Sequence, residues 1–332
     1  MERYEVREQV REGVTSCLLI DHGTKTEAEV LTGIGMNLIR FEAHGQPLVL
    51  PPPSVEKLKT EPFAPFQYGT PVLFPPNRVN NGTFAYQGRT YRLPLNEPTN
   101  HLHGEICSRS WKVIRYSATE EQGASITAEF RYAEHADILS YFPHPLVFSL
   151  TYSLQDGCLS LSGSIVNEGD HEAPFAFGLH PYFLVPDTNQ EKTQIVLPAQ
   201  EEWPVTTEAF VTGLPEQTEL SEELNGGVPL DRFPAGSCWL FTLEGGTKTC
   251  SIRHPYAGLL LHYQVDESFP YLVLFRPDWA SAISFEPYTY VTDAFNLPWD
   301  YAKTGARGLA AKEEFVFRTK LWAEEIQSEK GE

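Results

Sequence analysis

The stretch that decides the fold class is residues 148–165, which read Phe148-Ser-Leu-Thr-Tyr-Ser-Leu-Gln-Asp-Gly-Cys-Leu-Ser-Leu-Ser-Gly-Ser-Ile165. Apolar or aromatic residues alternate with mostly polar ones on both sides of Asp156-Gly157, a pair that favours a tight turn. A period of two residues places the apolar side chains of a strand on one face of a sheet. The stretch therefore predicts a β-hairpin that buries one face.

The same alternation recurs along much of the chain. Residues 125–132 follow it, and residues 83–93 predict a second hairpin around Gln87-Gly88. Further strands are expected in the second half of the chain, at residues 237–243, 248–253, 258–265, 271–276 and 314–321. The turn sequence Glu244-Gly-Gly predicts that the first two of these form a hairpin.

The segments outside these strands show no long run with the 3.6-residue period of a helix. Residues 47–66 are rich in proline and predict an ordered, irregular loop. The acidic residues 216–224 fit a short surface helix or a solvated loop, and we favour the loop. The chain is therefore predicted to be all-β, one large and mostly antiparallel domain over residues 1–332.

The composition limits the possible partners. The 332 residues carry a formal net charge of −19, which argues against binding to nucleic acid or to an anionic membrane surface. Five scattered cysteines without CxxC spacing fit reduced thiols rather than a disulfide framework. The N-terminal residues lack the apolar core of a signal peptide, and no apolar run is long enough to span a membrane. We therefore expect a cytoplasmic protein.

The strongest chemical signal is a histidine within residues 175–183, Phe-Ala-Phe-Gly-Leu-His-Pro-Tyr-Phe. Apolar residues alternate before it like one face of a strand, which places His180 on the opposite face. Taken alone, this fits a core histidine that bonds a backbone carbonyl. A second stretch, Ile283-Ser-Phe-Glu-Pro-Tyr288, holds the lone carboxylate of Glu286 in similar surroundings. Together the two groups match a general acid and a general base.

Two further motifs are candidates for ligand binding. Two prolines lead into Asn77-Arg78, and a planar guanidinium suits hydroxyl-rich or anionic ligands, although a solvated surface arginine fits equally well. His101 and His103 lie two residues apart, so they would share one face of a strand as a metal half-site or a polar wall. A cupin-like metal site needs a glutamate farther along than Glu105, so we expect no metal.

The order of these motifs resembles the aldose 1-epimerases, or galactose mutarotases. The resemblance runs from the early strands to about residue 300 and rests on Asn77-Arg78, Leu102-His-Gly104, Gly178-Leu-His-Pro-Tyr-Phe183, Glu286-Pro287 and Asp293-Ala-Phe-Asn296. It implies a large β-sandwich of the supersandwich type, with a sugar cleft on one face. It also implies that the protein interconverts the α and β anomers of a free aldohexose, such as glucose or galactose, without a cofactor.

The resemblance also assigns roles to individual residues. Glu286 would be the general base that takes the proton of the anomeric C1 hydroxyl, and His180 the general acid that protonates the ring oxygen O5. Asn77, Arg78 and His103 would bind sugar hydroxyls. The expected pH dependence is bell-shaped, with the acidic limb from Glu286 and the basic limb from His180. Aromatic residues near the motifs could pack against the sugar, namely Tyr182, Phe183, Tyr288 and Trp279.

The sequence departs from the best-known members at two points. Those members carry a sugar-contacting aspartate in a Gly-Tyr/Phe-Asp-His segment, which this chain lacks, and Asp231 is the substitute in the corresponding interval. The histidine motif has Pro181 where typical galactose enzymes have serine. These differences leave the implied mechanism intact and leave the identity of the sugar open.

Three alternatives stay open at the level of sequence. A hexose-6-phosphate 1-epimerase would use the same acid and base, but it would need additional basic residues near the cleft. A non-catalytic carbohydrate-binding protein on the same fold would not need a matched acid and base. A glycoside hydrolase usually needs two carboxylates, whereas the matched pair here is a histidine and a glutamate. In each case the partner is a small-molecule sugar.

Overall fold

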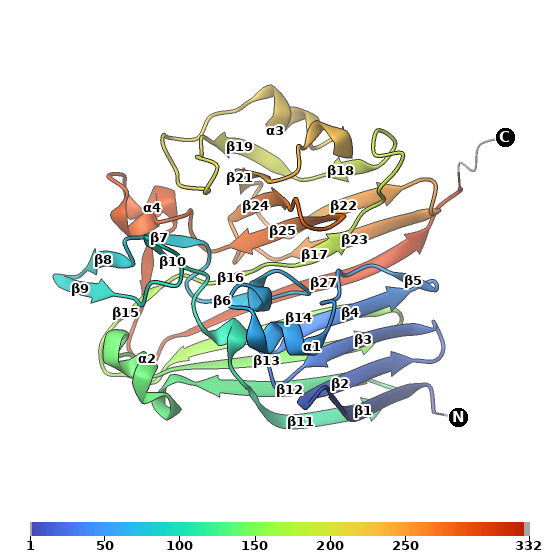
Figure 1. The fold of residues 1–332 in the computed structure, drawn as a ribbon, viewed down its shortest axis with the longest axis horizontal. Helices are drawn as coiled ribbons and strands as arrows, with labels where there is room; N and C mark the ends of the chain where they lie inside the picture. Colours follow the sequence, from blue (N-terminus) through green and yellow to red (C-terminus); the bar gives the residue numbers. More distant parts are fainter. Residues whose placement is uncertain (1, 329–332) are drawn as a thin grey trace.

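The hairpin predicted at residues 148–165 lies inside the largest sheet of the computed structural model, which describes residues 2–328 (Figure 1). Strands β13 (Leu146–Gln155) and β14 (Cys158–Asn167) pair antiparallel, with Asp156-Gly157 in the turn. The sheet has nine strands in the order β11 (Lys112–Thr119), β12 (Gly123–Arg131), β13, β14, β27 (Glu314–Glu325), β23 (Leu259–Val265), β22 (Lys248–His254), β18 (Gln194–Val196) and β20 (Val228–Pro229).

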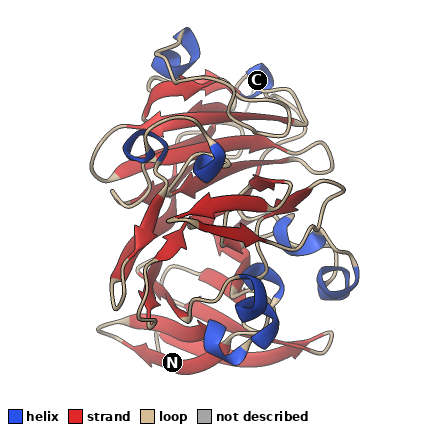
Figure 2. Cartoon of the chain, turned by 90° about the vertical axis from the view of Figure 1, so that its left-hand side faces the viewer, coloured by secondary structure: helices blue, strands red, loops and turns tan. Residues whose placement is uncertain are grey.

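Two smaller antiparallel sheets form the second layer. The first runs in the order β1 (Tyr4–Arg11), β2 (Val14–Asp21), β3 (Thr26–Leu31), β4 (Asn37–Ala43) and β5 (Gln46–Pro47). The second has the order β19 (Ala199–Trp203), β21 (Ser237–Leu243), β24 (Tyr271–Arg276), β25 (Ala282–Tyr288), β16 (Gly178–Leu179) and β6 (Val72–Leu73), with β17 (Tyr182–Leu184) also paired to β25. Strands dominate the chain and the helices are short (Figure 2).

Backbone hydrogen bonds join the two smaller sheets. The amide of Leu50 donates to the carbonyl of Tyr182 at 2.9 Å, and the amide of Leu184 donates to the carbonyl of Leu48 at 2.9 Å. The second layer is therefore continuous across β17. The predicted large antiparallel β-sandwich is confirmed, and the chain forms it from residues spread over nearly its whole length.

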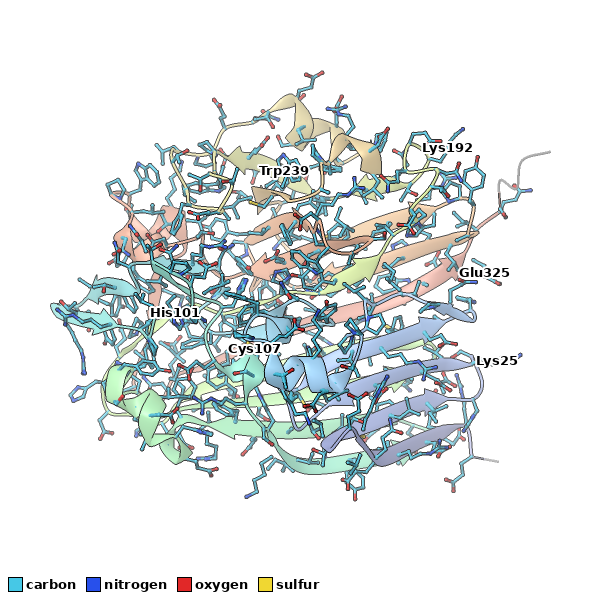
Figure 3. The ribbon with its side chains drawn as sticks, viewed as in Figure 1. Lys25, His101, Cys107, Lys192, Trp239 and Glu325 are labelled. Carbon is cyan, nitrogen blue, oxygen red and sulfur yellow. The ribbon has the colours of Figure 1, made fainter. Side chains whose placement is uncertain are left out.

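One predicted pairing is wrong. The sequence predicts a hairpin of residues 237–243 with 248–253, but β21 pairs with β19 and β24, whereas β22 pairs with β18 and β23. The Glu244-Gly-Gly turn instead carries the chain from one layer to the other; Trp239 marks β21 in Figure 3. An alternating pattern predicts that one face of a strand is buried, but it does not predict which strand pairs with it.

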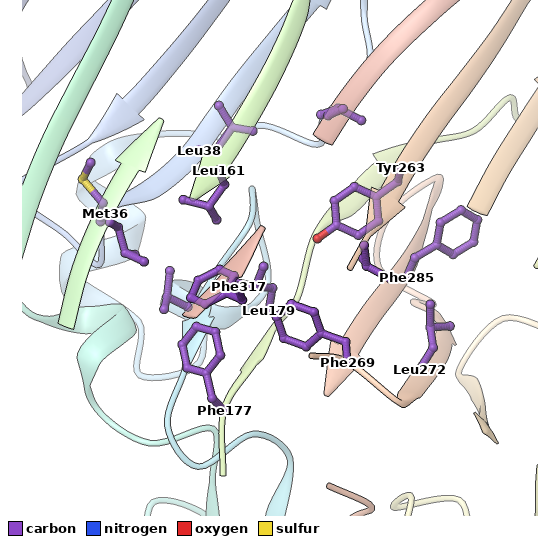
Figure 4. Close-up of a cluster of buried hydrophobic side chains, with 14 of the residues drawn as sticks. Met36, Leu38, Leu161, Phe177, Leu179, Tyr263, Phe269, Leu272, Phe285 and Phe317 are labelled. Carbon is purple, nitrogen blue, oxygen red and sulfur yellow. The ribbon is translucent and has the colours of Figure 1, made fainter. Parts of the chain in front are cut away.

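The core lies between the layers, where side chains of all three large sheets meet (Figure 4). Leu38 comes from the five-stranded sheet, Leu161 and Phe317 from the nine-stranded sheet, and Phe285 from the seven-stranded sheet. Phe177 packs against Phe317 with ring centroids 4.7 Å apart. Full burial of one such side chain stabilises the fold by about 1.5–3 kcal/mol. The core therefore fixes the chain immediately before His180.

Short helices and ribbons connect the strands. The helices are α1 (Val55–Thr60), α2 (Ala136–Tyr141), α3 (Glu219–Glu223), α4 (Tyr301–Thr304) and the 3₁₀ turns η1 (Ala64–Phe66), η2 (Ile106–Ser108), η3 (Tyr132–Glu134), η4 (Leu230–Arg232) and η5 (Ala294–Asn296). Two-stranded ribbons pair β7 (Arg78–Asn80) with β10 (Asn100–Leu102), β8 (Thr83–Tyr86) with β9 (Arg89–Arg92), and β15 (Ala173–Phe175) with β26 (Arg307–Leu309). The β8–β9 ribbon confirms the predicted hairpin at residues 83–93.

Two loop predictions need correction. Residues 216–224, expected as a loop, contain α3, because Thr218 and Ser221 cap its first turn reciprocally. Residues 47–66, expected to be irregular, contain α1, whose amide at Lys57 is capped by the Ser54 hydroxyl. Of the expected domain over residues 1–332, residue 1 and residues 329–332 lie outside the described part. Within residues 2–328, none of the helices has the length and apolar character that crossing a membrane requires.

Candidate active site

A cavity of about 310 Å³ opens on the face of the seven-stranded sheet that points away from the core. We call it the His–Glu cavity. It is lined by polar, charged and aromatic residues from several elements: Phe63, Phe66, Gln67, Asn77, Arg78, Glu97, Leu102, His103, His180, Tyr182, Thr207, Ala209, Cys238, Val273, Phe275, Trp279 and Glu286.

The register of β25 brings His180 and Glu286 together. Gly178 pairs with Tyr288, and Tyr182 pairs with Ser284, so the same antiparallel register places His180 opposite Glu286. The strand is interrupted at this point, and the amide of His180 donates instead to the carbonyl of residue 71 at 2.9 Å. The His180 Nε2 atom lies 3.3 Å from Glu286 Oε1. Proton transfer typically occurs over about 2.6–3.2 Å, and such contacts tighten when substrate binds.

A hydrogen-bonded chain behind the ring fixes which nitrogen faces the glutamate. His180 Nδ1 lies 2.8 Å from the Ser284 hydroxyl, and this hydroxyl donates to the carbonyl of Pro181 at 2.7 Å. Because a hydroxyl has one proton, Nδ1 must be the donor to Ser284. The neutral ring therefore carries its proton on Nδ1, and its unprotonated Nε2 faces Glu286.

Two tyrosines complete the surroundings of the pair. The Tyr182 ring stacks on His180 with centroids 4.4 Å apart, and its hydroxyl lies 3.1 Å from Nε2 and 3.1 Å from the carbonyl of Phe66. The hydroxyl of Tyr288 donates to Glu286 Oε2. These contacts leave Oε1 and Nε2 as the atoms that face each other at the cavity.

Burial controls the charges of the pair. Desolvation lowers the pKa of His180 to about 3 and raises the pKa of Glu286 to about 8, the latter against the smaller opposing effects of the Tyr288 hydrogen bond and Arg78. Near neutral pH, burial therefore favours a neutral imidazole and a protonated carboxyl. The pair thus holds one exchangeable proton, on the Glu286 carboxyl, at the cavity surface where a ligand oxygen could accept it.

His103 and Asn77 form a second wall. Both residues adopt a left-handed backbone conformation, with a φ of 61° at His103 and 56° at Asn77. Two hydrogen bonds join them. The backbone amide of Asn77 donates to His103 Nδ1 at 3.1 Å, and the backbone amide of His103 donates to the Asn77 carbonyl at 3.0 Å. Burial, together with nearby His180, lowers the pKa of His103 well below its usual range. With Nδ1 accepting, the neutral ring carries its proton on Nε2 and can donate it to a ligand oxygen.

Arg78 lines the cavity and forms an ion pair with Glu97, which the sequence analysis did not predict. Its Nε and Nη2 atoms donate to the two carboxylate oxygens of Glu97 at 2.8 and 2.7 Å, and Nη1 donates to the carbonyl of Glu208 at 3.0 Å. The Asn77 side-chain oxygen accepts from the amide of Arg78 at 2.9 Å, which orients the motif. The guanidinium is thus held rigidly at the edge of the cavity.

Two residues that the sequence analysis singled out, Asp231 and His101, lie outside the His–Glu cavity. Asp231 lies exposed in η4 and does not line the His–Glu cavity. The Nδ1 atom of His101 (Figure 3) donates to the carbonyl of Pro94 at 2.6 Å, and the side chain lines a different, largely apolar cavity. The two histidines do not share a face, because β10 ends at Leu102 and the left-handed backbone of His103 turns the chain.

The sequence profile of aldose 1-epimerases matches residues 16–322, nearly the whole chain. The chain belongs to the aldose 1-epimerase family. A protein of Escherichia coli strain K12 known as uncharacterized protein YihR is 30% identical over 191 residues, 56% of this chain and 57% of that protein. The uncharacterized protein YphB of the same strain is 27% identical over 233 residues, 67% of this chain and 73% of YphB. The match to YihR thus spans little more than half of that relative.

Solved structures share the fold of this aldose 1-epimerase family member. A galactose mutarotase-like protein from Clostridium acetobutylicum has a TM-score of 0.87 at 24% identity, covering 98% of this chain and 99% of that one. Galactose 1-epimerase from Lactobacillus acidophilus has a TM-score of 0.74 at 18% identity, covering 98% of this chain and all of that one. At these identities the likeness shows the supersandwich fold.

The sequence analysis of this family member missed two residues of the site, Ser284 behind the His180 ring and Glu97 in the cavity lining. Ser284 carried a usable signal, because it stands two residues before Glu286 and so shares its face of the strand. Glu97 carried none, since its Asn-Glu-Pro setting is that of any surface turn. Of the aromatic candidates, Tyr182 and Trp279 line the cavity, Tyr288 contacts Glu286, and Phe183 is buried in the core.

Proposed function

We propose that this protein is an aldose 1-epimerase that interconverts the α and β anomers of a free aldohexose, such as glucose or galactose. The observation that carries the proposal is the 3.3 Å contact between His180 Nε2 and Glu286 Oε1 at the floor of an open, polar cavity. Mutarotation needs one proton donor and one proton acceptor beside a hemiacetal. Membership of the aldose 1-epimerase family supports the same reaction.

The reaction begins with proton movement within the pair. When a sugar hydroxyl approaches Glu286, the stored proton moves from Oε1 to His180 Nε2 and leaves a carboxylate beside an imidazolium. Glu286 then takes the proton of the C1 hydroxyl, while Nε2 gives its proton to the ring oxygen O5. The C1–O5 bond breaks, and an open-chain aldehyde with a free C5 hydroxyl remains.

The ring closes by the reverse steps. After rotation about the C1–C2 bond, the C5 hydroxyl attacks the other face of C1 and returns its proton to His180. Glu286 returns a proton to O1, so that no proton is gained or lost over the cycle. Each positioned acid or base typically contributes about 10²–10⁴ in rate, which makes the pair sufficient for a reaction that already proceeds in water.

The remaining walls would hold the sugar during ring opening. His103 would donate its Nε2 proton to a sugar oxygen, and Arg78 would donate to neighbouring hydroxyls. Phe275 and Trp279, whose ring centroids are 5.6 Å apart, offer an apolar surface for the C–H groups of the pyranose. Aromatic side chains together with a few placed polar groups are typical of small-molecule binding sites.

The two other classes that the sequence left open fit the cavity less well. A hydrolase needs two carboxylates across a scissile bond, yet both oxygens of Glu97 are bonded to Arg78. A binding protein has no need of a buried acid and base with opposed pKa shifts, because hydrogen bonding to a sugar does not require proton transfer.

The proposed function is tested by exchange NMR on equilibrated glucose and galactose. The protein should transfer saturation between the α and β anomeric proton signals, and His180→Asn and Glu286→Gln should each reduce this exchange by about 100-fold or more. A wild-type protein that binds either sugar without accelerating exchange would instead support the carbohydrate-binding alternative.

A further inference from the structure

The Arg78–Glu97 pair has no part in the proton transfers described above. We propose that Glu97 makes the His–Glu cavity selective for an uncharged sugar: with Arg78 it forms a neutral, rigid fork that binds two sugar hydroxyls and excludes sugars that carry phosphate. The proposal rests on the proposed function and deepens it by naming the class of substrate.

The geometry of the pair is that of a bidentate fork. Two parallel hydrogen bonds of 2.8 and 2.7 Å join the guanidinium to the carboxylate, with the side chains of Arg78 and Glu97 only 23% and 14% exposed. A partly buried, bidentate pair is stronger and more specific in geometry than an exposed one. Arg78 therefore faces the cavity with its charge already compensated.

The fork is also held in place from both sides. The Glu97 amide donates to the carbonyl of Asn100 at 3.1 Å, and the Asn96 side chain forms two hydrogen bonds with the backbone of Leu102, at 2.7 and 2.8 Å. On the other side, the Glu208 carbonyl accepts from Arg78. A ligand that uses the fork as it stands meets little cost of reorganisation.

The free hydrogen-bonding capacity of the fork suits hydroxyl groups. A guanidinium has five N–H groups, and three of those of Arg78 are already used for Glu97 and the Glu208 carbonyl. One N–H group of Nη1 and one of Nη2 have no hydrogen bond among the described residues, and the Glu97 oxygens still have lone pairs. Because a hydroxyl both donates and accepts, two neighbouring hydroxyls can satisfy Arg78 and Glu97 together. An ionised phosphate oxygen only accepts, so it leaves the Glu97 oxygens without a donor.

The charge of the whole cavity points in the same direction. Among the described residues that line it, Arg78 is the only lysine or arginine, and Glu97 cancels its charge. A phosphate monoester would bring a charge of about −1.5 to −2 to a cavity without a free cation. The formal net charge of −19 on the chain adds a long-range repulsion. An uncharged aldose meets neither obstacle.

The test compares the wild type with Glu97→Gln, using Glu244→Gln as the matched control. Glu244 is exposed in the turn after β21, so its variant changes the net charge equally without touching the cavity. Anomeric exchange is measured by NMR for glucose and for glucose 6-phosphate. We expect the wild type to prefer glucose by at least about 100-fold in kcat/KM. Glu97→Gln should reduce this preference by at least about 30-fold, because it raises KM for glucose and frees Arg78 for phosphate.

Two outcomes would overturn the proposal: equal turnover of glucose and glucose 6-phosphate by the wild type, or an unchanged preference in a folded Glu97→Gln variant. Calorimetric titration of the same proteins with the same two sugars separates this proposal from the proposed function. If the wild type binds glucose more tightly than glucose 6-phosphate, and Glu97→Gln loses that preference, the proposed role of Glu97 is supported even if the protein does not catalyse anomeric exchange. Binding of neither sugar, or a binding preference that Glu97→Gln retains, would overturn it.

Discussion

The Nδ1 atom of His180 lies 2.8 Å from the hydroxyl of Ser284, on the side of the ring that faces away from Glu286. This contact, together with the bond from Ser284 to the Pro181 carbonyl, leaves Nε2 as the nitrogen that faces Glu286. In the proposed reaction Ser284 is thus a positioning residue: it selects the tautomer of the ring and acts only through His180.

We predict that Ser284→Ala lowers kcat by about 10-fold or more with little change in KM, because the ring loses its fixed tautomer while the sugar contacts remain. Steady-state kinetics by polarimetry measures both constants. Ser251→Ala is the matched control, since Ser251 lies 2.8 Å from Nδ1 of His262 in the nine-stranded sheet, outside the cavity. Equal losses in the two variants would contradict the assigned role.

The pH dependence should be bell-shaped with a broad plateau, because activity requires that the pair hold one proton. Below pH about 3 His180 gains a second proton, and above pH about 8 Glu286 loses the stored one. The acidic limb therefore belongs to His180 and the alkaline limb to Glu286. This is the reverse of the assignment made from the sequence, because burial lowers the pKa of His180 below the raised pKa of Glu286. A kcat/KM profile that already declines within the plateau, between pH about 4 and pH about 7, would contradict this.

Replacing Glu286 should stabilise the fold at alkaline pH. Its raised pKa means that the folded state holds a proton that the unfolded state releases above the ordinary carboxyl pKa, so its contribution is full at low pH and is lost as pH rises through about 8. Glutamine stays neutral, so Glu286→Gln should gain on the order of 1–3 kcal/mol over the wild type at pH 8.5 and little at pH 4.5. Urea unfolding at both pH values measures this difference, and a pH-independent difference would contradict it.

Trp279 should contribute to sugar binding rather than to chemistry. It lines the cavity beside Phe275 and remains 41% exposed, which is unusual for a tryptophan without a partner. Trp279→Ala should raise KM by about 3–10-fold and leave kcat within about 3-fold. Tyr256→Ala, at a residue that is 39% exposed and outside the cavity, serves as the control. A lower kcat at unchanged KM would contradict the binding role.

The sequence predicted what depends on local patterning. The alternation around Asp156-Gly157 predicted the central hairpin, and the matched settings of His180 and Glu286 indicated residues that the structure places side by side. In both cases the residues of the strand itself show which of its faces is buried. The resemblance to aldose 1-epimerases then supplied the class of reaction that local patterns could not.

What the sequence could not provide depends on contacts between distant residues. The carboxylate beside Arg78 is Glu97 in a neighbouring loop, whereas Asp231 had been chosen by its position along the chain and lies exposed on η4. In the same way, Glu244-Gly-Gly has the composition of a hairpin turn but connects two layers. Neither choice of partner is recorded in the residues next to the site.

In the proposed reaction, His180 and Glu286 open and close the ring of a free aldose. Polarimetry of freshly dissolved α-D-glucose and α-D-galactose at pH 7 tests it most directly, with the wild type, Glu286→Gln and no protein compared at equal temperature. We predict faster relaxation to the spontaneous equilibrium rotation with at least one sugar, and a loss of about 100-fold or more of this acceleration in Glu286→Gln. Relaxation at the uncatalysed rate with both sugars, or full activity in Glu286→Gln, would contradict it.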